Sequence, residues 1–300
     1  MPEPKRRLNH RSRDSKRSHS AVTSVRLGSC VLKFNVPRVM GIVNVTPDSF
    51  SGDGVGDDFE LAVRRGLGMF DSGADLVDVG GESTRPGASV VSSDIEISRA
   101  IPVVERLSKA YPGRVSIDTM KPEVAMSALY AGAAIVNDVS GLRSIEMIEA
   151  VAEHDAAAII MHMKGEPRTM QECPRYKDVV REIIQFFEDR IAAAEKGGVS
   201  ARKIMVDPGI GFGKTVEHNL EILSRLREFK ALGKPVVIGV SRKSFIGRLT
   251  GSAAPERLDG SIAAAVLAVR EGADVVRVHD VPETVRALKV ANAIIARQIR

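Results

Sequence analysis

Cysteine, tryptophan and long apolar runs are scarce in this sequence. Of its 300 residues two are cysteine and none is tryptophan. Cys30 and Cys173 belong to no metal or redox motif, so we expect two free thiols in a reducing compartment, the cytoplasm. No apolar run has the ~20 residues that a membrane span needs, and the basic N-terminus lacks the apolar segment of a secretory signal. These features argue against an integral membrane protein and against a disulfide-rich secreted domain.

Basic residues exceed acidic ones, but the excess lies at one end. The net charge is +5, yet residues 1–26 hold eight basic and two acidic residues, which leaves 35 basic and 36 acidic residues elsewhere. The body of the chain is near neutral, so its charge gives no support for nucleic-acid binding. Residues 1–25 have too little apolar surface to offset the entropy of ordering, and we expect a disordered, passive tail. A contact with RNA or anionic lipid, or a transit peptide, is the alternative.

Short apolar segments alternate with amphipathic helical segments from Val39 onward. The predicted strands are Val39–Val45, Leu76–Gly80, Val115–Asp118, Ile135–Asp138, Ala157–Met161, Ile204–Asp207, Val236–Gly239 and Val275–Val278. The predicted helices are 58–72, 92–110, 121–131, 144–154, 177–197, 218–231, 255–271 and 281–297. Because the strands are short and almost wholly apolar, we expect a parallel sheet that is covered on both sides.

Eight strand–helix units predict an α/β protein of the (β/α)8 TIM-barrel class. Such a barrel forms a single domain, here residues 26–300, and one or two short strands between Val25 and Val36 are expected to cap its base. An open doubly wound sheet is the alternative, because periodicity defines units and not closure.

Local signals mark several helix ends. Ser93-x-x-Glu96 and Asp280-x-x-Glu283 resemble capping boxes that would open two helices. Gly197-Gly198 and Gly272 are typical of helix exits.

Polar residues follow the predicted strands rather than being spread evenly. They are Asn44, Gly80-Gly81-Glu82-Ser83-Thr84-Arg85-Pro86-Gly87, Asp118-Thr119, Asn137-Asp138, His162-Met163-Lys164, Asp207-Pro208-Gly209, Ser241-Arg242-Lys243 and Arg277-Val278-His279-Asp280. One Asn or Asp at a strand end is usually a turn or helix cap. Polar ends on eight units are hard to assign to capping alone, and in a barrel all would converge at the carboxyl-end mouth.

Several familiar motifs fail when checked. Gly211 to Thr215 resembles the tail of a nucleotide P-loop, but position 208 is Pro208 instead of glycine. Gly209-Ile210-Gly211 begins a dinucleotide fingerprint that Lys214 interrupts, and Gly239-Val240-Ser241 begins a nucleophile elbow that Lys243 interrupts. His154, Asp155 and His162 have no convincing metal spacing.

The strand ends suit two kinds of ligand. Carboxylates, amides and an ammonium group match a flat polar heterocycle; these groups belong to Asp118, Asp207, Asn44, Asn137 and Lys243. Arg277 and His279 are two residues apart, so on an extended strand end they face the same side, where a phosphate or pyrophosphate would fit. The alternatives are that Arg277 only pairs with Asp280 and that His279 is a satisfied barrel histidine.

The order and length of these motifs resemble dihydropteroate synthases. The matching segments are Asn44-Val45-Thr46-Pro47-Asp48-Ser49-Phe50, Gly80 to Gly87, Met161-His162-Met163, Pro167 to Gln171, Asp207 to Lys214, Ser241-Arg242-Lys243-Ser244-Phe245 and Arg277-Val278-His279-Asp280. The resemblance extends from about Val39 to Asp280. One departure is Ser51-Gly52-Asp53, where many relatives have Asp-Gly after the serine, and it makes a specific role for Asp53 doubtful.

The resemblance implies a folate-pathway transferase, usually a homodimer, that is the target of sulfonamides. It joins (7,8-dihydropterin-6-yl)methyl diphosphate to para-aminobenzoate and releases pyrophosphate and 7,8-dihydropteroate. The implied catalytic residues are Asp118, Lys243, Arg277 and His279. The implied substrate-binding residues are Thr84, Arg85, Asp118, Asn137, Asp207, Phe212, Ser241, Lys243, Arg277 and His279.

The resemblance also implies a Mg²⁺ ion and two mobile loops. Asn44 would help to place the ion on the diphosphate. The loop residues are Thr46, Pro47, Asp48, Ser49, Phe50 and Pro86, of which Asp48, Phe50 and Pro86 would shape the para-aminobenzoate pocket. A related methyltransferase that uses methyltetrahydrofolate, and a non-catalytic pterin-binding paralogue, remain the alternative functions.

Overall fold

The computed structural model describes residues 21–46, 58–83, 90–166 and 169–298. Its strands are β1 (Ser24–Leu27), β2 (Cys30–Lys33), β3 (Arg38–Asn44), β4 (Leu76–Gly80), β5 (Val115–Asp118), β6 (Ile135–Asp138), β7 (Ala157–Met161), β8 (Ile204–Asp207), β9 (Val237–Ile238) and β10 (Val275–Val278). Its α-helices are α1 (Phe59–Asp71), α2 (Ser93–Ala110), α3 (Pro122–Tyr130), α4 (Ile145–Glu153), α5 (Val179–Lys196), α6 (Val216–Ser224), α7 (Ser244–Thr250), α8 (Leu258–Arg270) and α9 (Val281–Gln298). Short 3-10 turns are η1 (Ala201–Lys203), η2 (Leu226–Leu232) and η3 (Ala254–Glu256).

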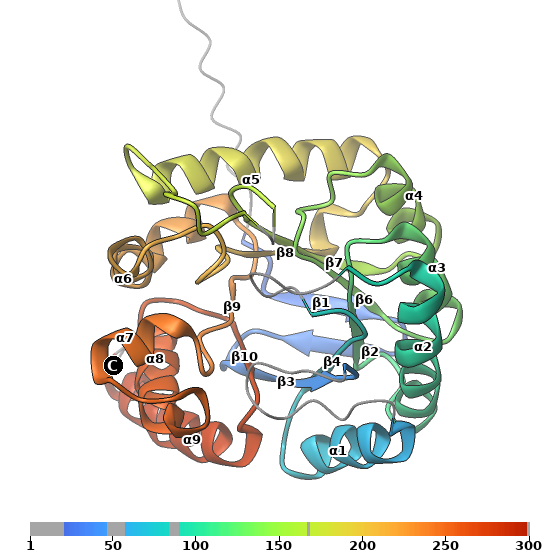
Figure 1. Ribbon diagram of the computed structural model, residues 1–300, viewed down its shortest axis with the longest axis horizontal. Helices are drawn as coiled ribbons and strands as arrows, with labels where there is room; N and C mark the ends of the chain where they lie inside the picture. Colours follow the sequence, from blue (N-terminus) through green and yellow to red (C-terminus); the bar gives the residue numbers. More distant parts are fainter. Residues whose placement is uncertain (1–20, 47–57, 84–89, 167–168, 299–300) are drawn as a thin grey trace, which may run out of the picture.

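Eight of the described strands form one parallel sheet inside a ring of helices (Figure 1). The strand order is β8-β7-β6-β5-β4-β3-β10-β9. The first and last strands of this order meet at a parallel bridge between Val206, in β8, and Val236, just before β9. There the N–H of Val206 donates to the carbonyl of Pro235 at 3.0 Å. This contact brings the two ends of the sheet together, and the predicted (β/α)8 barrel is confirmed.

Side chains alternate along each barrel strand between an outer and an inner face. Outward residues such as Val77, Val79 and Ile117 are buried against the helices. Inward residues at the amino ends of the strands form a separate apolar layer; they are Met40, Leu76, Ile135, Ala157, Ile159, Met205, Val237 and Val275. The lower half of the barrel is thus a packed core, which leaves only the carboxyl ends for a ligand.

The antiparallel hairpin β1–β2 covers the amino end of this core. Val25, Leu27 and Leu32 are buried in the same cluster as the inward strand residues. The carbonyl of Gly233, just before β9, accepts from the N–H of Val22 at 2.9 Å. The expected capping of the barrel base by short strands is confirmed, whereas the predicted tail, residues 1–25, falls mostly outside the described residues.

The helix ends differ from the predicted ones at a few places. Ser92, not Ser93, caps α2 by accepting from the N–H of Ile95, and the carboxylate of Glu96 binds Lys121 instead of closing a capping box. The helix predicted over 218–231 is two pieces, α6 and η2. The short helix α7 had no predicted counterpart, because its few residues follow a polar strand end. The glycine exits were correct: Gly197 is the C-cap of α5, and Gly272 has a φ of 101°.

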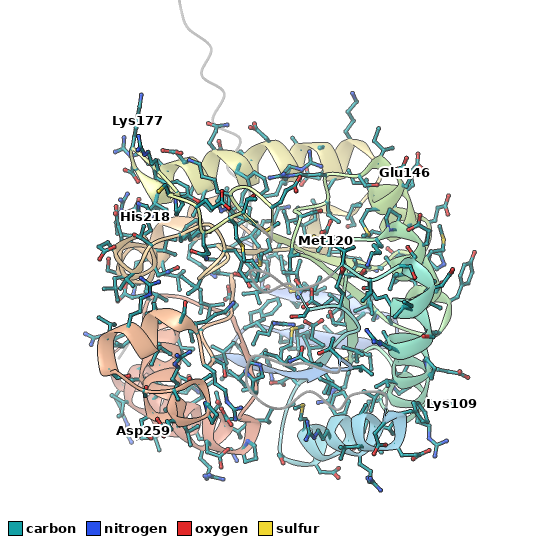
Figure 2. The ribbon with its side chains drawn as sticks, in the orientation of Figure 1. Lys109, Met120, Glu146, Lys177, His218 and Asp259 are labelled. Atoms are coloured by element: carbon teal, nitrogen blue, oxygen red, sulfur yellow. The ribbon has the colours of Figure 1, made fainter. Side chains whose placement is uncertain are left out.

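Charged side chains point away from the barrel on the outer helices. Figure 2 shows Lys109, Glu146 and Asp259 on the outside of the helix ring, whereas Met120, just after β5, lies inside it. Among the described residues, no helix combines the length and the apolar character needed to cross a bilayer.

Candidate functional site

The inward face of the strands changes from apolar to polar toward the carboxyl end. Four of the apolar inward residues are followed two positions later by a polar one: Leu76 by Asp78, Ile135 by Asn137, Met205 by Asp207 and Val275 by Arg277. Since side chains two residues apart lie on one face of a strand, these polar groups enter the same space above the core. The prediction that the polar strand ends converge is therefore confirmed for Asn137, Asp207 and Arg277.

A buried ion pair occupies the centre of this polar layer. The Arg277 guanidinium donates from Nε to Asp78 Oδ2 at 2.6 Å and from Nη2 to Asp118 Oδ2 at 2.7 Å. Asn137 Nδ2 donates to the same Asp78 oxygen at 2.9 Å. The alternative that Arg277 only pairs with Asp280 is wrong, because Asp280 binds Arg242 instead.

Two carboxylate oxygens in the cluster are buried without a hydrogen-bond partner among the described residues. They are Asp78 Oδ1 and Asp118 Oδ1. Burial raises the pKa of Asp118 to about 7, although the positive charge of Arg277 opposes this shift. A buried acceptor without a donor costs about 1–3 kcal/mol, so this cluster is suited to a ligand that brings N–H groups to it.

Asp207 and Lys243 lie at neighbouring strand ends. Asp207 Oδ1 accepts from the N–H of Gly209 at 2.7 Å, in a turn where Gly209 has a φ of 68°. A Cβ on Gly209 would lie 2.0 Å from the carbonyl oxygen of His162, so this turn requires glycine. Burial raises the pKa of Asp207.

Lys243 lies over an aromatic ring. Its Nζ is 4.3 Å from the ring centroid of Phe212, a cation–π distance. Burial, and next the charge of Arg277, lower the pKa of Lys243 to about 8. The backbone just before Lys243 is strained, because Arg242 has a φ of 56°, in the left-handed region that favours glycine. Arg242 is held there by Ser261 Oγ, which accepts from its N–H at 2.8 Å, and by the Asp280 carboxylate.

A second part of the site lies beside β3 and β10. Ser241 Oγ is 2.9 Å from His279 Nδ1 and accepts from the N–H of His279 at 3.3 Å. A cavity of about 150 Å³ opens here, and it is lined by Ile42, Val43, Asn44, Arg65, Met69, Arg242 and His279. A Cβ on Gly80 would lie 3.9 Å from Asn44 Oδ1 and 3.9 Å from Asp118 Oδ2, so this second part adjoins the buried ion pair.

Most of the predicted loop residues lie outside the described residues. These are Pro47, Asp48, Ser49, Phe50, Thr84, Arg85 and Pro86. Thr46 is described and is buried at the end of β3. Their expected part in substrate binding stays a prediction.

Sequence reasoning missed Asp78. This residue lies inside β4 with valines on both sides, so it is not at a strand end, where polar residues were sought. Its signal was a single carboxylate at an inward position of an apolar strand. Its side chain is fully buried and holds both Arg277 and Asn137.

Two further polar groups around the mouth had no role assigned from the sequence. Lys121 Nζ forms ion pairs with Glu82 Oε2 at 2.8 Å and with the buried Glu96 Oε2 at 2.5 Å. The buried Lys214 donates to the carbonyl of Phe212 at 2.9 Å and contacts His162 Nδ1 at 3.0 Å. Burial, with the positive charge of Lys214, lowers the pKa of His162 to about 2, so this imidazole is neutral and accepts.

Comparison with known proteins identifies the family. The family model described as pterin binding enzyme matches residues 40–279. Dihydropteroate synthase of Escherichia coli K12 is 47% identical over 262 residues, which cover 87% of this chain and 93% of that protein. The chain belongs to the dihydropteroate synthase family. This membership confirms the expected transferase and its folate-pathway reaction, which the motifs implied.

Solved structures of the family agree with this fold. A Yersinia pestis dihydropteroate synthase with a sulfonamide drug complex is 40% identical, with a TM-score of 0.89 over 91% of this chain and 99% of that one. A Xanthomonas albilineans dihydropteroate synthase with 4-aminobenzoic acid is 46% identical, with a TM-score of 0.84 over 91% and 98% of the two chains. The same protein in complex with 7,8-dihydropteroate has a TM-score of 0.81 at 43% identity, over 90% and 98%.

Proposed function

We propose that the mouth of this barrel joins (7,8-dihydropterin-6-yl)methyl diphosphate to para-aminobenzoate. The products are 7,8-dihydropteroate and pyrophosphate. The observation that carries this assignment is the buried Asp78–Arg277–Asp118 cluster, which has two unpartnered carboxylate oxygens and adjoins a cavity lined by basic groups. One part suits the N–H groups of a pterin, and the other suits the diphosphate attached to it.

In this proposal the pterin lies among Asp118, Asn137, Asp207 and Lys243. Unpartnered Asp118 Oδ1 accepts an N–H of the pterin ring, and the ammonium group of Lys243 donates to a ring acceptor. The ring of Phe212 supports Lys243 from below at 4.3 Å. A flat ligand fits such a site because each of these groups comes from a different strand or loop around the rim.

His279, Arg277 and Asn44 act on the diphosphate in this proposal. His279 and Asn44 line the cavity beside the ion pair. Mg²⁺ prefers oxygen ligands and commonly binds through one or two protein groups plus substrate phosphates, and the Asn44 amide oxygen fits such a role. When bound, Mg²⁺ would neutralise charge that develops on the departing pyrophosphate.

The proposed reaction begins with loss of the leaving group. The C–O bond breaks and its electron pair leaves with the pyrophosphate, while the pterin ring delocalises the positive charge on the methylene carbon. The ionised Asp118 carboxylate, close to this ring, stabilises that charge. The amino group of para-aminobenzoate then forms the C–N bond and loses a proton, and since the amine is neutral at pH 7 it needs no strong base beforehand.

Para-aminobenzoate is proposed to bind at the outer edge of the mouth. Ser241 and Lys243 flank this position, and Thr84, Arg85, Pro86 and the segment from Thr46 to Phe50 complete it. Enclosure of the site by these segments would keep water from competing with the amine.

Association into a homodimer in the cytoplasm is part of the proposal. Support comes from exposed apolar side chains on two adjacent helices: Leu267 on α8 is 58% exposed, and Val290 and Ile294 on α9 are 62% and 59% exposed. Such a face is commonly covered by a partner of the same kind.

A steady-state assay for pyrophosphate release tests the function. Release that requires both the pterin diphosphate and para-aminobenzoate is the expected result. A methyltransferase would release no pyrophosphate and would consume methyltetrahydrofolate, and a non-catalytic paralogue would bind the pterin diphosphate without turnover. Either outcome would contradict the proposal.

A further inference from the structure

A side chain from outside the strand ends reaches the cavity beside Asn44 and His279. This side chain is Arg65, in the middle of α1. Its neighbour Arg64 carries the same charge but lies exposed on the outer surface of the helix. Helix α1 therefore directs one of its two adjacent arginines to the same cavity as the strand-end residues.

The close packing of α1 on β3 explains the position of Arg65. A Cβ on Gly41 would lie 2.6 Å from the sulfur of Met69, so the absence of a side chain at Gly41 allows the helix to approach the strand. Arg65 is four residues before Met69 and lies one turn nearer the start of the helix. A helix that follows a parallel strand runs back along it, so this turn lies level with the carboxyl end of β3, where Asn44 is.

The lining of the cavity indicates what Arg65 binds. Arg65 lies in the same cavity as Asn44 and His279, the residues that we assign to the diphosphate. A guanidinium group can donate two parallel hydrogen bonds to a phosphate and is therefore well suited to this position. We propose that Arg65 is a further diphosphate-binding residue, which binds the phosphates of the substrate and the released pyrophosphate. This inference rests on the proposed function and adds a residue to it.

Binding of inorganic pyrophosphate tests the inference directly. Wild type, Arg65→Gln, Arg65→Lys and Arg64→Gln are compared by calorimetry with pyrophosphate and Mg²⁺. Loss of one charge-assisted hydrogen-bonding group predicts that Arg65→Gln binds pyrophosphate about tenfold more weakly, and Arg65→Lys less so. Arg64→Gln, with the same change of charge one residue away, is expected to bind like wild type. The difference should shrink at high salt.

Kinetics separate this role from a structural one. Arg65→Gln is expected to raise the KM for the pterin diphosphate about tenfold, with the KM for para-aminobenzoate and the melting temperature unchanged. Wild-type pyrophosphate affinity in Arg65→Gln, or an equal loss in Arg64→Gln, would overturn the inference while leaving the proposed function intact. Absence of pyrophosphate release by the wild-type chain would instead refute the proposed function.

Discussion

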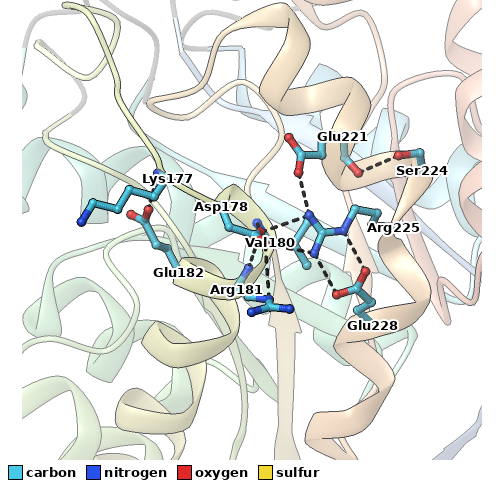
Figure 3. A network of polar contacts seen from close by, with 9 residues as sticks. All are labelled: Lys177, Asp178, Val180, Arg181, Glu182, Glu221, Ser224, Arg225 and Glu228. Carbon is cyan, nitrogen blue, oxygen red and sulfur yellow. Dashed lines mark hydrogen bonds and ion pairs between the residues drawn. The ribbon is translucent and has the colours of Figure 1, made fainter.

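Two arginines of this chain each bind more than one carboxylate, in opposite surroundings. Arg277 joins Asp78 and Asp118 within the barrel mouth, where Asp78 is fully buried. Arg225 joins Asp178, Glu221 and Glu228 on the outer surface, where it ties the start of α5 to α6 and η2 (Figure 3). The Arg225 side chain is 28% exposed, and its three partners are 32–46% exposed.

The two networks differ in whether buried carboxylate oxygens are left without a hydrogen-bond donor. The partners of Arg225 are satisfied by other contacts. Asp178 also caps α5 by accepting from the N–H groups of Val180 and Arg181. All three carboxylates are partly exposed and can bind water. At Arg277 two buried carboxylate oxygens have no partner among the described residues. A surface network of this kind contributes little and needs no ligand, whereas a buried one with spare acceptors is prepared for a ligand.

Replacing Arg277 with alanine should give the largest effect. The change leaves Asp78 and Asp118 close together without their shared cation, which costs about 3–5 kcal/mol of folding free energy for a broken buried pair. Turnover should fall by about 10²–10³-fold or more, because a preorganised charge is lost. Urea unfolding and the pyrophosphate-release assay measure the two losses. Activity within tenfold of wild type would show that the ion pair is only structural.

Alanine at Asp207 or Lys243 should act mainly on binding. Each variant loses a charged group that we assign to the pterin, so its affinity for the pterin diphosphate should fall about 100-fold, as measured by calorimetry. Lys289→Ala, a loss of the same charge on an exposed position of α9, serves as the control. Undiminished affinity in both Asp207→Ala and Lys243→Ala would remove the assignment of these residues.

The Asp118 carboxyl predicts a pH-dependent difference in stability. Its pKa is raised from 3.8 to about 7 by burial, against the effect of Arg277, so between these pH values the folded chain binds more protons than the unfolded chain. The free energy of unfolding should therefore fall as the pH rises from about 4 to about 7, and this contribution should be constant above that. In Asp118→Asn this contribution should be absent, so the total slope should be smaller than in wild type; buried Asp207, whose pKa is also raised, keeps its own contribution. Urea unfolding without ligand, with the exposed Asp259→Asn as control, checks it; equal slopes in Asp118→Asn and wild type would contradict it.

Arg225→Ala should give the smallest effect. Its ion pairs are exposed, and pairs of this kind are worth about 0–1 kcal/mol each. We expect a loss of about 1 kcal/mol in unfolding free energy and unchanged kinetic constants. If Arg225→Ala lowered turnover as Arg277→Ala does, the distinction between the two networks would fail.

Much of the site was predictable because the barrel fold converts sequence position into location. Once strands alternate with helices, a polar residue in the last two positions of a strand must lie near the carboxyl-end rim, and Asn137, Asp207 and Arg277 follow this rule. Asp78 did not follow it, since it lies in the middle of β4 between two valines. Arg65 could not be found by this rule either, because it lies on a helix and reaches the cavity only through the close approach of Met69 to Gly41.

The sequence by itself determined the order of strands and helices, the polar rim and the family, since hydrophobic periodicity and long local motifs are written along the chain. Which charges pair was decided only by the tertiary structure. A pairing with Asp280, three residues away, was the alternative interpretation of Arg277, yet Arg277 binds Asp78 and Asp118, 199 and 159 residues away. Closing the sheet into a barrel sets such partners across the mouth, and no spacing in the sequence encodes a distance across a closed ring.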